Sequence, residues 1–185
     1  MVDQRALRQR RLANEYRELM TISGGVIEIE PLGSAPYEKY RVTFHVRTIV
    51  SPAPAFRDQT VCILTIPGGY PDIVPKIAVE ESSMPQPWHP NWYRSGTWCF
   101  GFWSREESLV NYLYRCAKTI QFSPAFTDAR PDAAANREAV EFWNANLEKD
   151  GVIPSDTKEL PTADAEAPRI SILARSNPKI RILRD

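Results

Sequence analysis

Residues 61–80 carry the sequence VCILTIPGGYPDIVPKIAVE, in which a connector rich in proline and glycine separates two strand-like runs. The runs, VCILTI from Val61 and KIAVE from Lys76, are bounded by turn-forming residues, as short strands are. Toward the N-terminus, VIEIE from Val26 and an apolar alternation over residues 40–46 add two more such runs. Consecutive strands joined so closely pair antiparallel, so the sequence predicts a four-stranded antiparallel meander.

Helical periodicity precedes the strands. Residues 5–20 contain neither proline nor glycine, and they repeat apolar side chains at the spacing of one helix face. That face comprises Leu12, Tyr16 and Leu19. The sequence therefore predicts an amphipathic N-terminal helix that covers one face of the sheet.

Two further helices are expected after the strands. Ser104-x-x-Glu107 has the form of a capping box, and the apolar stripe over residues 109–120 predicts a buried helix. Residues 132–147 predict another helix, with Asp132 as its N-cap. Its inward-facing residues are expected to be Ala135, Ala139, Phe142, Trp143 and Leu147.

These elements together indicate the α+β class, with an N-terminal helix, a four-stranded antiparallel meander and C-terminal helices. The 185 residues are 43% hydrophobic, which is enough for one core, and the predicted domain covers residues 1–150. Residues 151–185 are interpreted as a linker and a basic C-terminal tail. The tail contains RISIL and KIRIL around an Asn-Pro turn, which predicts a hairpin or a strand pair added to a partner.

The charge and hydropathy of the chain limit the classes of partner and the cellular location that we expect. Lys and Arg number 23, and so do Asp and Glu, so the overall charge favours neither a nucleic acid nor an anionic membrane as partner. The first residues are charged where a secretion signal needs an apolar core, and no apolar run has the length of a membrane span. We therefore expect a cytoplasmic location.

The segment between the last strand and residue 104 lacks periodicity and is long for a structureless loop, which indicates a functional role. Six of the 16 prolines fall between residues 67 and 90 and stiffen the approach to Cys99. Aromatic side chains crowd the same loop. Proteins that stack bases on aromatic rings surround those rings with cationic side chains, and this loop has few of them. The sequence therefore favours packing of the aromatic side chains against the domain.

The three cysteines differ in setting. Cys62 alternates within a strand and Cys116 lies on a helix stripe, so both are interpreted as small buried hydrophobes. Cys99, in GTWCFG, lies in the aperiodic segment, so no helix or strand pattern assigns it to the core, and it is the candidate nucleophile. No C-x-x-C pair accompanies it, and neither a metal nor a cofactor is expected. A Cys-His hydrolase using His45 or His89 stays open as an alternative.

The motifs around Cys99 resemble those of the ubiquitin-conjugating enzymes. IPGGYPDIVPKIAV precedes His89-Pro90-Asn91, Cys99 follows the histidine by ten residues, and Trp103-Ser104 leads into a helix. The resemblance covers roughly residues 3–150, and it implies an N-terminal helix, a four-stranded meander and C-terminal helices. The tail lies outside it.

The resemblance also implies an activity. Cys99 would accept the C-terminal carboxyl of a ubiquitin-like protein from an activating enzyme as a thioester and pass it to an amine on a protein substrate. Asn91 would stabilise the oxyanion of that transfer, while His89 and Pro90 would mainly shape the loop. Arg5, Arg8 and Arg11 fall within two helical turns and are expected to bind an acidic surface of the activating enzyme.

Some positions depart from the family pattern. Only three residues separate Cys99 from Trp103, and Arg105 replaces a proline. The acidic residue that assists the attacking amine is unassigned between Asp128 and Asp132. Such divergence with an added tail resembles the prokaryotic branch of the family, whose members often act in antiviral defence. A catalytically inactive module of the same fold that binds a ubiquitin-like protein is the alternative.

Overall fold

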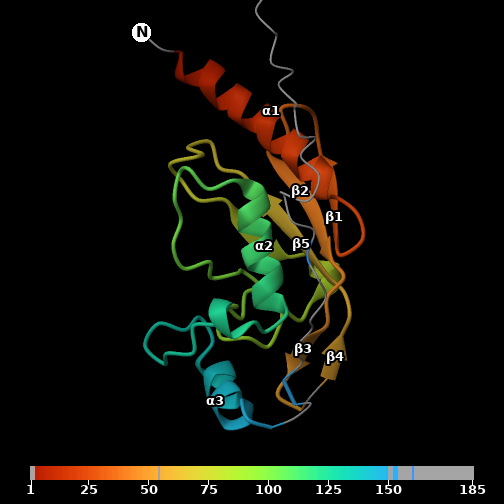
Figure 1. Cartoon of the computed structure of the whole chain (residues 1–185), viewed down its shortest axis with the longest axis vertical. Helices are drawn as coiled ribbons and strands as arrows, with labels where there is room; N and C mark the ends of the chain where they lie inside the picture. Colours follow the sequence, from red (N-terminus) through yellow and green to blue (C-terminus); the bar gives the residue numbers. More distant parts are fainter. Residues whose placement is uncertain (1–2, 54, 150–151, 154–159, 161–185) are drawn as a thin grey trace, which may run out of the picture.

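An N-terminal helix, a four-stranded antiparallel sheet and later helices form the protein (Figure 1). The computed structural model describes residues 3–53, 55–149, 152–153 and 160, and over these residues it confirms the predicted α+β class and element order. The elements are α1 (Gln4–Ile22), β1 (Ile27–Leu32), β2 (Lys39–Phe44), β3 (Thr48–Ser51), β4 (Ala55–Arg57), β5 (Thr60–Thr65), β6 (Lys76–Val79), the 3-10 helix η1 (Glu81–Ser83), α2 (Leu109–Ile120), the 3-10 helix η2 (Pro124–Phe126) and α3 (Arg137–Asn146).

The sheet has the strand order β1-β2-β5-β6 with every neighbouring pair antiparallel, which is the predicted meander. Tyr40, Leu64 and Ile77 lie in register across three strands, and all three side chains are buried in the main core. The helix α2 crosses the sheet (Figure 1) and contributes its apolar stripe to the same core. Cys62 and Cys116 are fully buried in that core, as predicted.

A buried carboxylate joins α1 to α2. Glu15 is only 2% exposed, and it accepts hydrogen bonds from the Tyr70 hydroxyl at 2.6 Å and from the Leu109 N–H at 2.8 Å. The Arg11 guanidinium lies 2.6 Å from the same carboxylate. A carboxylate out of water needs such donors, so these contacts anchor the N-terminal helix to the first residue of α2.

A short hairpin that the sequence did not predict lies between β2 and β5. Its strands, β3 and β4, pair antiparallel with a register shift near Ile49. Ile49 is fully buried and packs with Phe122 and Trp143 in a second apolar cluster. Strands of three and four residues separated by a proline-rich turn do not reach the length at which alternation identifies a strand.

The predicted capping box at Ser104 is wrong. The helix α2 begins at Leu109, and its N-cap is Ser108, whose hydroxyl accepts from the Asn111 N–H at 3.2 Å. Ser104 instead hydrogen-bonds Glu106, while Glu107 forms an ion pair with Arg115. Of the two serines, which lie four residues apart, the second caps the helix, and the Glu15 carboxylate accepts from the Leu109 N–H beside this cap.

The predicted start of the last helix is also wrong. Asn136, not Asp132, is the N-cap of α3, and its side-chain oxygen accepts from the Ala139 N–H at 3.2 Å. The backbone N–H of Asn136 donates to the Pro90 carbonyl at 3.1 Å, which fixes where the helix begins. Trp143 is buried as expected, whereas Leu147 is 55% exposed and does not face inward.

Residues beyond the predicted domain also contribute side chains to the core. Ile153 packs against the second cluster, and Leu160 packs against the main core. The predicted hairpin of RISIL and KIRIL lies outside the described residues. Among the helices of the described part, none combines the length and the apolar character that crossing a membrane requires.

Candidate functional site

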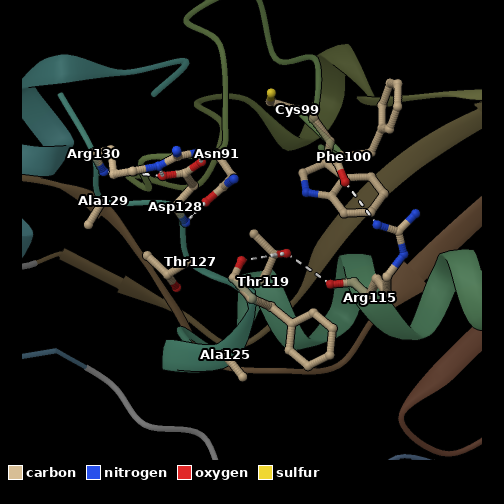
Figure 2. Close-up of a pocket in the computed structure, with 12 residues that line it drawn as sticks. Asn91, Cys99, Phe100, Arg115, Thr119, Ala125, Thr127, Asp128, Ala129 and Arg130 are labelled. Atoms are coloured by element: carbon tan, nitrogen blue, oxygen red, sulfur yellow. Dashed lines mark hydrogen bonds and ion pairs between the residues drawn. The ribbon is translucent and has the colours of Figure 1, made fainter. Parts of the chain in front are cut away.

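Cys99 opens onto a cavity of about 600 Å³ beside α2 and η2. Figure 2 shows Asn91, Asp128 and Arg130 on one side of this cavity and Phe100 and Arg115 on the other, with Cys99 between them. The lining residues are Asn91, Trp98, Cys99, Phe100, Arg115, Thr119, Ala125, Phe126, Thr127, Asp128, Ala129 and Arg130.

The loop over residues 91–99 folds back on itself and brings Cys99 to Asn91. The Cys99 N–H donates to the Asn91 carbonyl at 2.7 Å, and Trp92 pairs with Trp98 in an isolated β-bridge. The return is made at Gly96, whose φ of +85° lies in the left-handed region that glycine adopts readily. The structure thus brings together the two residues predicted to be catalytic.

The Asn91 side chain has a fixed orientation. Its Oδ1 accepts a hydrogen bond from the Asp128 N–H at 2.9 Å. Because a backbone N–H can only donate, the oxygen must face Asp128, and the amide nitrogen takes the other side. Among the described residues the Asn91 Nδ2 has no hydrogen-bond partner, so this donor is available to a group bound in the cavity.

His89 is a buried structural residue. Its side chain is fully buried, its Nδ1 accepts the Asn91 N–H at 3.0 Å, and its Nε2 lies 3.2 Å from the Thr127 hydroxyl. The ring also packs against Phe122 at a centroid distance of 4.7 Å. Burial lowers the pKa of His89 to about 3, so the imidazole is neutral at physiological pH. These contacts are of the kind expected of a residue that shapes the loop.

Neither histidine is placed as a base for Cys99. Both ring nitrogens of His89 are engaged by Asn91 and Thr127. His45 follows β2 and pairs with Glu28 of β1 at 3.2 Å, at the opposite edge of the sheet from the loop that carries Cys99. The geometry therefore gives no support to the Cys-His hydrolase alternative.

Tyr93 contacts the thiol but was not expected from the sequence. Its hydroxyl donates to the Cys99 sulfur at an oxygen–sulfur distance of 3.8 Å, and this hydrogen bond raises the pKa of Tyr93. The Tyr93 side chain is 45% exposed. Tyr93 differs from the buried rings of the same loop in its exposure and in its contact with the thiol, and the sequence carries no signal of that difference.

The two candidate acidic residues differ in position. Asp128 lines the cavity, and its carboxylate receives two hydrogen bonds from the Arg130 guanidinium, at 2.9 and 2.7 Å. These bonds hold the pKa of Asp128 below its usual range, so the carboxylate is ionised at neutral pH. Asp132 is exposed and does not line the cavity.

No family model matches the chain, and no curated protein matches it. Among the described residues, no three His, Cys, Asp or Glu side chains are grouped as ligands of a metal ion.

Most of the aromatic side chains around Cys99 pack into the protein. Trp92 and Trp98 are buried in the main core, and the Trp98 ring lies 5.0 Å from that of Tyr112. Phe100 and Trp103 are half-buried against the same core. These rings are not free to stack on bases, which agrees with the packing interpretation. Tyr93 and Phe102 are the exceptions, at 45% and 78% exposed.

The three arginines predicted to bind a partner have different surroundings. Arg5 is exposed. Arg8 pairs with Glu38 and donates to the Pro67 carbonyl at 3.0 Å, and Arg11 belongs to the buried Glu15 cluster. Intramolecular contacts thus occupy two of the three side chains, and partner binding by this helix stays a prediction.

Proposed function

We propose that the protein is a ubiquitin-conjugating-type acyl carrier, with Cys99 as the nucleophile that holds a ubiquitin-like C-terminus as a thioester. One observation carries the proposal: the backbone of Asn91 holds Cys99, while the side-chain nitrogen of Asn91 faces away from Asp128 and has no partner among the described residues. A nucleophile and an unused, fixed amide donor that line the same cavity are the groups that acyl transfer requires. The resemblance of His89-Pro90-Asn91 and Cys99 to this enzyme family points the same way.

Loading of the carrier is a thioester exchange. The Cys99 thiolate attacks the carbonyl carbon of the thioester that joins the ubiquitin-like protein to its activating enzyme. A new carbon–sulfur bond forms at Cys99, and the bond to the activating enzyme breaks, so that its sulfur leaves as a thiolate. A thiol is partly ionised near neutral pH and intrinsically nucleophilic, so this step needs no histidine base.

Transfer to the substrate passes through an oxyanion. A neutral amine attacks the Cys99 thioester, the amide bond forms, the carbon–sulfur bond breaks, and the amine proton is released to the departing thiolate or to water. The Asn91 Nδ2–H group donates to the negative oxygen of the intermediate. One such donor is typically worth about 100- to 1,000-fold in rate.

Asp128 is the acidic residue that we assign to the incoming amine. It is ionised, lines the Cys99 cavity and is tied through its backbone to the Asn91 side chain. Arg130 is 72% exposed, so its side chain can swing away when a cationic amine approaches. Asp132, outside the cavity, has no role in this proposal.

The cellular setting follows from the resemblance to the prokaryotic branch of the family. An activating enzyme supplies the ubiquitin-like protein, a protein amine receives it, and the pathway is bacterial antiviral defence. Neither nucleic acid nor membrane takes part. Of the predicted helix residues, Arg5 is the one without an intramolecular ion pair among the described residues, so we assign contact with the activating enzyme to Arg5 first.

A chemically activated donor tests the function without an activating enzyme. Ubiquitin and related ubiquitin-like proteins carrying a C-terminal mercaptoethanesulfonate thioester are incubated with the protein, and the adduct is resolved without reductant. We expect an adduct that reductant removes, absent from Cys99→Ala and converted into a reductant-stable adduct in Cys99→Lys. An undiminished adduct on Cys99→Ala would refute the assignment. Binding to wild type without any thioester would favour the inactive binding module.

Asn91→Asp isolates the role of the amide nitrogen. The aspartate keeps an oxygen that accepts from the Asp128 N–H, but it has no donor for the oxyanion. We expect loading of Cys99 to persist while transfer to free lysine slows by about 100-fold or more. Equal transfer rates in Asn91→Asp and wild type would exclude Asn91 as the oxyanion donor.

A further inference from the structure

Arg115 of α2 reaches the backbone that follows Cys99. Its Nη1 donates to the Phe100 carbonyl at 2.9 Å, and its Nη2 donates to the Phe102 carbonyl at 2.9 Å. Both carbonyls belong to the three-residue segment between Cys99 and Trp103. One guanidinium on a helix therefore holds two backbone groups of an irregular loop (Figure 2 shows the bond to Phe100).

A second ion pair fixes the guanidinium itself. The Glu107 carboxylate accepts from the Nε and the Nη2 of Arg115, at 2.8 and 2.9 Å, and the two side chains are 15% and 24% exposed, respectively. The cation also lies 5.6 Å from the Tyr112 ring centroid and 5.9 Å from that of Trp98. A planar fork that pairs with a carboxylate on one side and two carbonyls on the other cannot be reproduced by the single ammonium of a lysine.

The segment has little else to hold its main chain. Over the described residues, the backbone groups of residues 100–103 make no backbone–backbone hydrogen bond. Phe102 is 78% exposed and Gly101 has a φ of +74°. The Phe100 ring packs against Tyr112 at a centroid distance of 6.0 Å, and the Trp103 indole donates to the Pro71 carbonyl at 2.8 Å. These contacts anchor two side chains but leave the carbonyls of Phe100 and Phe102 to Arg115.

We propose that Arg115 is a positioning residue for Cys99: by holding the carbonyls of Phe100 and Phe102, it keeps the thiol in place against Asn91. The contact that it protects is the hydrogen bond from the Cys99 N–H to the Asn91 carbonyl, 2.7 Å long. The role of Arg115 in catalysis rests on the proposed function, whereas its role in stabilising the loop conformation does not. Glu107 acts through Arg115 by orienting the guanidinium.

Hydrogen exchange of the Cys99 amide tests the hold directly, without any ubiquitin-like protein. In Arg115→Ala we expect this amide to exchange about tenfold faster than in wild type, because charge-assisted bonds to the loop are lost. Amides in the β2–β5 ladder should change by less than about twofold. Arg115→Lys should exchange as fast as Arg115→Ala, and Lys118→Ala, which removes a cation from the same helix, should match wild type.

Two exchange results would overturn the proposal. One is a Cys99 amide that exchanges no faster than in wild type, or only in step with the ladder amides. The other is a lysine variant that restores wild-type exchange, because the fork geometry would then be unnecessary.

Transfer kinetics then separate this inference from the proposed function. With the Cys99 thioester loaded chemically, Arg115→Ala should lower the maximal rate of transfer to free lysine about tenfold and leave the half-saturating lysine concentration unchanged. An unchanged maximal rate would show that Arg115 does not position the thiol for transfer. If wild type forms no thioester, the proposed function fails, while the exchange result still decides whether Arg115 holds the loop.

Discussion

The two segments that flank Cys99 are held in different ways. Residues 81–98, before the cysteine, contain the 3-10 helix η1, a β-bridge, several internal backbone hydrogen bonds and the fully buried side chains of His89 and Trp92. Residues 100–103, after the cysteine, make no backbone–backbone hydrogen bond among the described residues. Arg115 holds two of their carbonyls, and the Trp103 indole donates to the Pro71 carbonyl at 2.8 Å.

The two segments are held in their conformations by different kinds of contact. The first segment is shaped mainly by its own sequence, through prolines, a glycine turn and buried rings, with Arg57 of β4 holding the carbonyls of Ser83 and Pro85. The second segment is held by an arginine of α2 that lies 15 residues after Phe100 and 13 residues after Phe102 in the sequence. We therefore expect damage before Cys99 to be costly for the whole fold and damage after it to remain local.

The largest effect should come from truncating a ring before the cysteine. Trp92→Ala removes a fully buried side chain from the main core, so the free energy of unfolding should fall by about 3–5 kcal/mol in chemical denaturation. The matched change after the cysteine, Phe102→Ala, removes a ring that is 78% exposed and should alter stability by less than about 0.5 kcal/mol. Similar losses of unfolding free energy in the two variants would contradict the proposed difference between the segments.

Acid should weaken the first segment through His89. Its pKa is about 3 in the folded protein, against about 6.5 in an unfolded chain. Between these values the unfolded state binds the extra proton, so stability is complete above about pH 6.5 and falls by up to about 1.4 kcal/mol per pH unit as pH drops toward 4. Denaturation of wild type and His89→Asn at pH 7, 6 and 5 checks this. The variant should have the shallower pH dependence, and equal slopes would contradict the prediction.

A smaller effect than those of Trp92 and His89 should come from the glycine after the cysteine. At Gly101 an added Cβ meets nothing within 4 Å, so Gly101→Ala costs only the strain of a positive φ, about 1 kcal/mol. Gly68→Ala is the control, because its Cβ also meets nothing and its φ lies outside the left-handed region. Thermal unfolding should separate the two variants, and no separation would mean that residue 101 relaxes without cost.

The regular elements were predictable because burial imposes a period on them. The alternation in β1, β2 and β5 and the stripe of α2 come from faces that point consistently toward the core. The hairpin β3–β4 has two fully buried residues, Thr48 and Ile49, and because they are adjacent they set no period. The first residues of α2 and α3 make bonds to groups distant in sequence, from the Leu109 N–H to Glu15 and from the Asn136 N–H to Pro90, and the local pattern does not contain these bonds.

The site was predictable only in part. The resemblance to a known family singled out Cys99, Asn91 and His89, and the structure places all three in one loop. The Cys99 N–H donates to the Asn91 carbonyl, and the Asn91 N–H donates to the His89 ring. The resemblance could not choose between Asp128 and Asp132, because they lie four residues apart in an aperiodic stretch and the bond from Asp128 N–H to Asn91 decides which one faces the cavity. Tyr93 and Arg115 gave no signal, since their roles depend on exposure and on contacts distant in sequence.

The unequal burial of the three cysteines also makes the unmodified protein suitable for labelling at a single site. Burial raises the pKa of the Cys62 and Cys116 thiols far above the usual range, so neither supplies a thiolate at neutral pH. Cys99 is partly exposed beside its cavity. Maleimides and haloacetamides applied to the native fold should therefore attach fluorophores, spin labels or crosslinkers to Cys99 without removal of the other two thiols by mutation.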